Sequence, residues 1–513
     1  MTSKLLVALM TTALASPALA DSCADLGAMT LPNIDIHTAA TQAAGTLPPD
    51  PMSAMTGGSP RPVEVGNHCL IEGKIEDREG VNGRYGIRFQ LRMPTEWNGK
   101  FLFQGGGGTD GFIAPAIGAI PSTGSTATPA LQRGYAVVSM DGGHKGMNLD
   151  FAADQQARLD LAYGSIGKVT NTAKALINTY YDTAPDQSYF MGCWNGGREA
   201  MMAAERFPLE FDGVVVGNPG FHLSRAALGG VWDVTQWAKI APRDAMHTAL
   251  TQADLDTVAA EINRQCDALD GLEDGIVAAY QQCSFDPEAL RGQIADDKLD
   301  ALLAVMDGAK DSAGNPVYTG WPWDPGVAAA GWRAWKLGTS ERPAMHQTLT
   351  VPSTGAVFMT PPQEVPQNPD FAELAKATAD VGGYFDADDT YLATFAQKGG
   401  KMVIFQGLAD PIFSATDIAR WYTEAKDDTG ADFAQLFMVP GMTHCGGGSP
   451  AFEDFDPLTL LEDWTAGGDA PVAMPARSPA LPEREMPVCA YPLEAHYNGG
   501  DLGSADSFTC TAK

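Results

Sequence analysis

Short apolar runs recur along the chain, and each one ends in a turn rich in glycine or proline. These runs lie within residues 100–111, 134–143, 187–193, 211–220, 399–411 and 434–448. Between them, residues 165–182 carry apolar side chains at helical spacing. Buried strands that alternate with helices indicate a largely parallel α/β sheet with helices on both faces. Residues 68–77 and 85–94 instead alternate apolar and polar side chains, which is typical of antiparallel strands.

The chain between Pro219 and Lys401, about 180 residues, has a different composition. It is rich in tryptophan, alanine and aspartate and lacks the strand–helix alternation. An insertion at the carboxyl ends of the strands commonly covers the site of such a sheet, so we interpret this segment as a lid. The expected division is a signal peptide at 1–20, a first core part at 21–220, a lid domain at 221–395 and a second core part at 396–513.

The first 20 residues have the composition of a secretory signal peptide. Lys4 precedes an apolar run, and Ala18-Leu19-Ala20 offers a small-x-small cleavage site. No later stretch is apolar and long enough to span a bilayer. We therefore expect a secreted or periplasmic protein without a membrane anchor. The formal net charge of −30 opposes binding to nucleic acid or anionic membrane surfaces and favours solubility.

The eight cysteines indicate disulfide bonds, because their number is even and the chain is expected to be exported. None of them forms a C-x-x-C pair, which argues against a zinc site or a thioredoxin-type centre. Composition leaves the pairing open. The simplest local pairs are Cys266–Cys283 and Cys489–Cys510, and a bridge between Cys23 and Cys69 is also expected.

The segment SYFMGCWNGGREAMMAAERFP, residues 188–208, has the layout of a nucleophile elbow. An apolar strand runs into Gly192, one residue (Cys193) separates that glycine from Trp194, and Asn195-Gly196 opens a helix, so the pattern is G-x-X-x-G. In that turn one exposed side chain is held up between strand and helix, and it is commonly a serine. Here it is Trp194, whose indole has one N–H donor and no usable lone pair, so it cannot attack an ester carbonyl.

Two further signals follow predicted strands, where α/β sheets place their ligands. Asp410 follows the strand KMVIFQG, and His444 follows the strand LFMVP. Their order after the elbow is that of the acid and base of an α/β-hydrolase triad, in which the acid holds the imidazole that moves the proton. Backbone N–H groups of the Gly105–Gly108 run are expected to bind an oxyanion. Taken singly, each signal is also compatible with an ordinary turn or a structural histidine.

These stretches closely resemble the tannase/feruloyl esterase family of secreted α/β-hydrolases. The resemblance rests on GCWNGGREAMMAAERFPLEFDGVVVGNP, GLADP and MVPGMTHCGGG and covers nearly the whole mature chain. It implies an α/β-hydrolase fold with a lid, Asp410 as acid, His444 as base and a Cys193–Cys445 bridge between the two loops. It places the nucleophile at position 194, where this chain departs from the family. We expect the oxyanion at Gly106, Gly107 and Asn195.

The lid contains CDALDGLEDGIV, residues 266–277, in which Asp267, Asp270 and Asp274 are spaced to converge in a tight loop. Hard oxygen ligands in such a loop suit Ca²⁺, although an acidic surface turn would read the same way. The spacing differs from that of an EF-hand. The resemblance implies a structural calcium ion here, with carbonyls of Leu272 and Ile276 completing the shell and Cys266–Cys283 closing the loop.

Two functions from different classes therefore remain open. The first is hydrolysis of esters of aromatic acids such as gallate or ferulate by acyl transfer, impaired or silent because of Trp194 or sustained by Cys193, Thr443 or an activated water. The second is a non-catalytic protein that binds an aromatic ligand on the hydrolase scaffold. The partner in both cases is a small aromatic molecule. The acid, the alcohol and the oligomeric state stay open.

Overall fold

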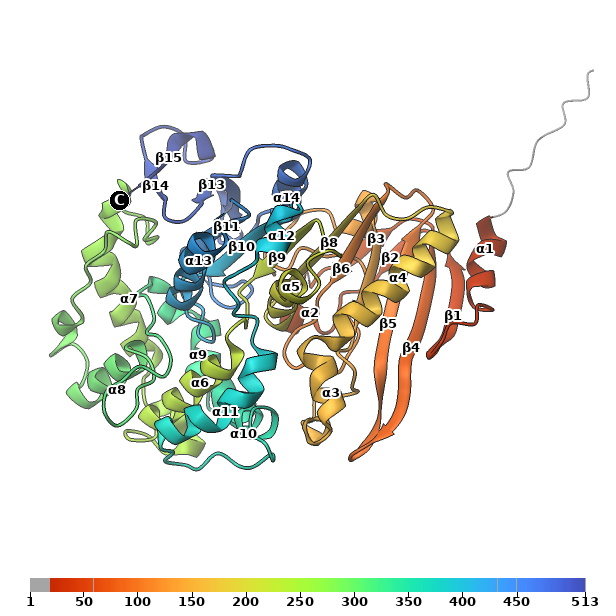
Figure 1. Cartoon of the computed structure of the whole chain (residues 1–513). Helices are drawn as coiled ribbons and strands as arrows, with labels where there is room; N and C mark the ends of the chain where they lie inside the picture. Colours follow the sequence, from red (N-terminus) through yellow and green to blue (C-terminus); the bar gives the residue numbers. More distant parts are fainter. Residues whose placement is uncertain (1–18, 59, 431, 449, 513) are drawn as a thin grey trace, which may run out of the picture.

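The computed structural model describes residues 19–58, 60–430, 432–448 and 450–512. Its centre is a nine-stranded sheet in the order β1-β4-β5-β7-β6-β8-β9-β10-β11 (Figure 1). The pairings from β7 to β11 are all parallel, whereas β1, β4 and β5 pair antiparallel. The strands are β1 Ile34–Gln42, β4 His68–Gly80, β5 Gly83–Pro94, β6 Lys100–Gln104, β7 Ala136–Met140, β8 Gln187–Cys193, β9 Gly213–Gly217, β10 Lys401–Gly407 and β11 Ala434–Val439. The mostly parallel sheet and the antiparallel pair β4–β5 confirm the strand predictions.

The parallel strands are buried on both faces, which is why their sequences are continuously apolar. Successive residues point to opposite sides: Phe101 and Phe103 pack in one core cluster, and Leu102 packs in the other. The first cluster includes helices α4 Ser165–Tyr181, α5 Asn195–Arg206 and α13 Ala415–Thr429. The second includes α14 Pro457–Thr465 and the hairpin β12 Ala473–Ser478 with β13 Leu481–Cys489.

The segment between β9 and β10 is mainly helical and adds no described strand to the central sheet. Most of its helices gather at one side of the molecule, in yellow-green to cyan, and the last, α12 Ala393–Gln397, packs on the core of the central sheet (Figure 1). The helices of the segment are α6 Leu223–Trp237, α7 Gln252–Cys266, α8 Asp296–Met306, α9 Ala330–Lys336, α10 Val351–Val357, α11 Phe371–Phe385 and α12 Ala393–Gln397. Apolar residues of this segment share a core cluster with Trp194 at the end of β8. The limits of the lid domain at 221 and 395 stay a prediction.

The remaining helices and strands are short. They are α1 Leu19–Leu26, α2 Ser53–Thr56, α3 Gln155–Leu159, β2 Gly45–Leu47, β3 Val63–Val65, β14 Glu494–Tyr497 and β15 Phe508–Thr511. Residues 1–18 of the predicted signal peptide lie outside the described residues, and α1 begins at Leu19. None of the helices in the described chain combines the length and the apolar character needed to cross a membrane.

Phe190 on β8 provides a test of the core beneath the elbow. Its ring is fully buried, stacks on Phe103 at 4.6 Å between centroids and meets Phe211 edge-on at 5.6 Å. We expect Phe190→Ala to lower the free energy of unfolding by about 3–5 kcal/mol, since it removes apolar contacts and leaves a cavity. Denaturant unfolding followed by fluorescence checks this. Leu209→Ala is the control, because Leu209 is 71% exposed; equal losses in both variants would contradict the argument.

Candidate active site

Trp194 occupies a sharp turn between β8 and α5, with φ 60° and ψ −118°. Few non-glycine residues adopt such a backbone, and it is stored strain that the neighbouring structure must hold in place. The turn depends on close backbone approach at its two glycines. A Cβ on Gly192 would lie 2.6 Å from the carbonyl carbon of Gly196, and a Cβ on Gly196 would lie 2.6 Å from the carbonyl oxygen of Gly106. This explains the G-x-X-x-G pattern around the tryptophan.

Asp410 and His444 meet at the carboxyl ends of β10 and β11. The Nδ1 atom of His444 lies 2.9 Å from Oδ2 of Asp410, and the side chains are 6% and 0% exposed. The amide of Asn218 donates to the same carboxylate oxygen at 2.7 Å, and the Ile412 N–H donates to Oδ1 at 2.8 Å. Burial raises the pKa of Asp410, but the His444 ring and these donors outweigh it and bring the pKa below its ordinary value. The carboxylate therefore stays ionised and orients the imidazole.

The other side of the His444 ring is closed by aromatic groups. The Trp194 ring lies 4.9 Å from it edge-on, the Phe413 ring 5.4 Å and the Trp335 ring 6.2 Å. Nε2 of His444 lies 3.6 Å from Sγ of Cys445. The Trp194 ring at the elbow therefore packs against the His444 imidazole, whose Nε2 would be the atom that exchanges protons with a nucleophile in a triad.

The disulfide Cys193–Cys445 joins the residue before Trp194 to the residue after His444, with Cα atoms 6.0 Å apart. It therefore holds the elbow and the histidine loop together at the site. The other bridges are Cys23–Cys69, Cys266–Cys283 and Cys489–Cys510. These are the four pairs that the sequence analysis names.

The glycine loop after β6 differs from the expectation. The Gly106 N–H donates to Oε2 of Glu199 at 3.1 Å, and the Gly107 N–H donates to Oδ1 of Asp110 at 3.0 Å. The N–H groups of both glycines therefore already donate hydrogen bonds to buried carboxylates. Of the three residues named, Asn195 borders the pocket, together with Gly108 of the same loop.

Sequence reasoning missed the buried charges that hold this loop. Arg198 is fully buried; its Nε donates to Oδ1 of Asn195 at 2.7 Å, and its Nη atoms donate to the carbonyl groups of Leu161, Ala162 and Phe385. Burial and the adjacent Glu199 carboxylate raise the pKa of Asp110 well above its ordinary value. Burial also raises the pKa of Glu199, while Arg198 opposes that shift. The one signal in the sequence is a charged Arg198-Glu199 pair directly before the apolar run 200–204 of the same helix.

An apolar pocket opens beside Trp194. Its walls come from the elbow, the glycine loop and the helical segment between β9 and β10, which supplies Trp335, Leu349 and Phe385. The space open to the centres of water-sized molecules is about 60 Å³. Among the described residues that border it, neither Asp410 nor His444 appears, because the rings of Trp194, Trp335 and Phe413 lie between.

The two alternative nucleophiles are both engaged. Cys193 is bonded to Cys445. The Thr443 hydroxyl is buried and donates to the carbonyl oxygen of Gly446 at 2.6 Å. Neither group presents a free nucleophilic atom to the pocket, so attack by an activated water is the one rescue that these contacts leave open.

The acidic loop after α7 carries three carboxylates, each with its own contacts. Asp270 accepts the N–H groups of Leu272 and Ala278, each at 3.0 Å, and burial, aided by the Asp274 and Asp267 charges, raises its pKa to about 7. Oδ1 of Asp267 is buried without a hydrogen-bond partner. Asp274 forms an ion pair with Arg484. The three carboxylates are not among the described groups whose ligand atoms all lie within 4.8 Å of one another.

Comparison with known proteins identifies the family. The model of a family described as tannase and feruloyl esterase matches residues 73–511. The chain belongs to the tannase and feruloyl esterase family. A mono(2-hydroxyethyl) terephthalate hydrolase from Piscinibacter sakaiensis is 37% identical over 514 residues, which cover 87% of this chain and 85% of the relative. A probable feruloyl esterase from Arthroderma benhamiae is 28% identical and covers 84% of this chain and 83% of the relative.

Solved structures of similar fold confirm the α/β-hydrolase prediction. Feruloyl esterase B from Aspergillus oryzae matches with a TM-score of 0.78 at 23% identity and covers 96% of this chain and 100% of that chain. The tannin acyl hydrolase from Aspergillus niger matches with a TM-score of 0.73 at 19% identity, and 97% of each chain is covered. The family prediction made from the motifs is likewise confirmed. This is a family of carboxylic ester hydrolases.

The two acids of the Asp110–Glu199 pair should respond differently when each is replaced by its amide. Because the pKa of Asp110 is raised, we expect this acid to hold the proton of the pair at neutral pH. Asp110→Asn mimics the protonated acid, so it should not lower the free energy of unfolding at pH 7. Glu199→Gln should cost about 3 kcal/mol, since it leaves the buried Arg198 without its neighbouring charge. Thermal unfolding at pH 7 measures both.

The pH dependence of stability provides a control for the protonation state of Asp110. An acid whose pKa is higher in the folded than in the unfolded chain stabilises the fold at pH values below its unfolded pKa, near 4. This contribution is lost as the pH rises through the folded pKa. Asp110→Asn lacks this titration, so its melting temperature relative to the unaltered protein should rise between pH 4 and pH 8. A constant difference would show that Asp110 is ionised throughout.

Proposed function

We propose that this chain is a carboxylic ester hydrolase of tannase and feruloyl esterase type whose acyl-transfer site is silenced, or strongly impaired, by Trp194. The observation that carries the proposal is the oriented Asp410–His444 pair with the Trp194 ring set against it at the elbow. In this proposal Asp410 and His444 would be the acid and base of a serine esterase triad, and the nucleophilic hydroxyl would be missing. Loss of the nucleophile from such a triad lowers turnover by about a millionfold.

The small size of the pocket also supports the proposal that Trp194 impairs the site. A dry cavity of about 150 Å³ takes up benzene, and the pocket here offers about 60 Å³ by the comparable measure. The Trp194 indole is only 6% exposed and packs against Trp335 with centroids 5.3 Å apart. We propose that the indole occupies the space in which an aromatic acyl group would lie. A residual water-based reaction would also need that space.

The substrate class rests on the family and its members. The relatives are named for hydrolysis of mono(2-hydroxyethyl) terephthalate and for feruloyl ester hydrolysis, and all of these acyl groups are aromatic. We therefore propose small esters of aromatic acids as the substrates of the scaffold. Gly108 and Asn195 are the proposed oxyanion donors, since both border the pocket while Gly106 and Gly107 are engaged elsewhere.

The segment 221–395 is proposed to act as the lid. Trp335, Leu349 and Phe385 from this segment form much of the pocket wall, so its position sets the shape of the cavity. Four disulfides are typical of proteins that fold in an oxidising compartment, and they support the proposal of a secreted or periplasmic protein with a signal peptide at 1–20.

A binding function on the same scaffold is the second candidate. The observation in its favour is the set of aromatic rings of Trp194, Trp335 and Phe413 around the pocket end, which offers faces and edges for an aromatic ligand. A binding protein would not need the Asp410–His444 pair for its ligand, whereas a hydrolase needs it as acid and base, and we therefore prefer the silenced hydrolase.

Trp194→Ser is the direct test of the proposal. It restores a hydroxyl beside Nε2 of His444 and opens the pocket at the same time. We expect turnover of aromatic esters to rise at least about 1,000-fold above the unaltered protein, in initial rates on gallate, ferulate and terephthalate monoesters.

Two matched variants separate the two effects of that change. Trp194→Ala opens the pocket without a nucleophile and is expected to stay inactive, and Trp194→Ser combined with His444→Ala should lose the gain. Equal activity in the alanine and serine variants would instead identify an activated water. Comparable turnover by the unaltered protein would overturn the silencing.

We also propose that the loop at 266–277 binds one structural calcium ion. Asp267, Asp270 and Asp274 supply carboxylate oxygens, and the carbonyls of Leu272 and Ile276 would complete the shell. The residues fit in their chemistry, because they are hard oxygen donors and Oδ1 of Asp267 is buried without a partner. Asp274 would have to share its carboxylate between the ion and Arg484.

Removal of calcium should therefore destabilise the unaltered chain. Calcium present at about 100 times its dissociation constant adds about 2.7 kcal/mol, which a chelator removes, so the melting temperature should fall by about 2–3 °C. Asp267→Asn should abolish the calcium-dependent shift, whereas Asp311→Asn at an acidic turn elsewhere should preserve it. Identical melting with and without chelator would refute the site.

A further inference from the structure

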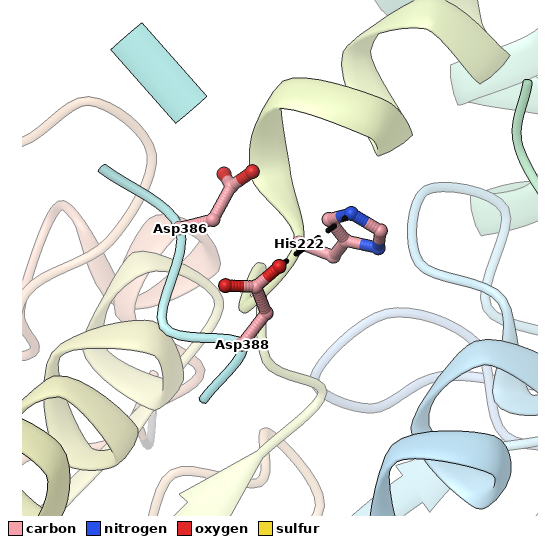
Figure 2. A group of neighbouring side chains, drawn as sticks. All are labelled: His222, Asp386 and Asp388. Carbon is pink, nitrogen blue, oxygen red and sulfur yellow. Dashed lines mark ion pairs between the residues drawn. The ribbon is translucent and has the colours of Figure 1, made fainter. Parts of the chain in front are cut away.

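A second cluster of ligand-type side chains lies away from the acidic loop. His222 stands at the start of α6, and Asp386 and Asp388 follow the end of α11 (Figure 2). One ligand atom from each of the three side chains lies within 4.8 Å of the others. The group joins the beginning and the end of the segment 221–395, although its members are far apart in the sequence.

The imidazole is already oriented for a ligand. Nδ1 of His222 lies 3.3 Å from Oδ2 of Asp417, whose side chain is 4% exposed and whose Oδ1 accepts a hydrogen bond from Arg420 at 2.8 Å. A carboxylate on one ring nitrogen is the common support of a metal-bound histidine, since it fixes the tautomer and directs the other nitrogen to the ion. That other nitrogen, Nε2, lies 3.8 Å from Oδ2 of Asp388.

The two carboxylates are held near Nε2 without a cationic partner of their own. Ser224 donates its N–H and its hydroxyl to Asp386 at 2.9 and 2.5 Å, which fixes that buried side chain. Within the described chain, His222 is the one group that forms an ion pair with Asp388, and Asp386 forms none. The Asp388 side chain is 52% exposed, so water can reach the cluster and fill further coordination positions.

We propose that His222, Asp386 and Asp388 bind one divalent first-row transition-metal ion of the Zn²⁺ type. One imidazole and two carboxylates with open water positions suit such an ion, and the imidazole disfavours Ca²⁺, which takes oxygen ligands. Ligands about 2.1 Å from a tetrahedral zinc lie about 3.4 Å apart, so closing the 3.8 Å gap needs a shift of only a few tenths of an ångström.

The ion would tie the two ends of the segment 221–395 to each other. Leu223 and Phe385, the chain neighbours of His222 and Asp386, both border the pocket. Metal binding should therefore stabilise the base of the pocket wall. This inference concerns a cation site and does not depend on whether the chain hydrolyses esters.

The test uses the full untagged chain, freed of metal with a chelator and dialysed. Titration calorimetry with Zn²⁺ should give one site that is at least ten-fold weaker in Asp388→Asn and in His222→Gln. Co²⁺ should give visible absorption bands in the unaltered protein that both variants lose. Zn²⁺ at about 100 times its dissociation constant should raise the melting temperature by about 2–3 °C.

Two control variants decide where the metal binds. Asp389→Asn changes the adjacent carboxylate outside the cluster, and Asp267→Asn changes the acidic loop; both should bind Zn²⁺ as the unaltered chain does. Asp388 is half-exposed, so its variant is expected to fold even if His222→Gln does not. Undiminished zinc binding in Asp388→Asn, or no binding by the unaltered protein, would overturn the proposal.

Discussion

The close backbone packing at the elbow governs the rest of the site. Gly192 and Gly196 allow the turn around Trp194 to fold against Gly106, and a single Cβ at either glycine would meet a backbone atom at 2.6 Å. This contact places the start of α5 directly beneath the glycine loop after β6. Once these two segments are locked together, the Cys193–Cys445 bridge brings the histidine loop to the same point. The geometry of the candidate site therefore follows from a packing constraint on glycines.

Buried charges complete the arrangement at that contact. Carboxylates of Glu199 and Asp110 accept the N–H groups of Gly106 and Gly107, and Arg198 ties the helix to carbonyl groups of neighbouring segments. Desolvating these groups is costly, and the low dielectric around them strengthens each satisfied hydrogen bond. The network consequently fixes the loop conformation firmly, and it does so independently of the side chain at position 194. A large ring can occupy the elbow without loss of the surrounding framework.

Much of the fold was predictable because its signals are local. The runs around residues 101–104, 189–193 and 402–407 are apolar since both faces of their strands are covered, and the elbow spacing is visible in five consecutive residues. Asp410 and His444 could be named because each directly follows a strand. The sequence gives no sign that the N–H groups of Gly106 and Gly107 donate to the carboxylates of Glu199 and Asp110, which is why it points to these two glycines as oxyanion donors. His222, Asp386 and Asp388 escaped notice because only the fold brings the two ends of the insertion together.

The Asp410–His444 pair also has a structural role beside Trp194. A buried carboxylate that orients an imidazole also holds structure, since Asn218, Ile412 and Phe413 all donate to it and thereby anchor the turn after β10. Removing either member would leave these donors, or the ring, unsatisfied in a dry environment. The pair thus has a structural reason to remain even where no nucleophile is served. Trp194 adds contacts of its own with His444 and Trp335, so the elbow is well packed around the indole, and these contacts stabilise the turn.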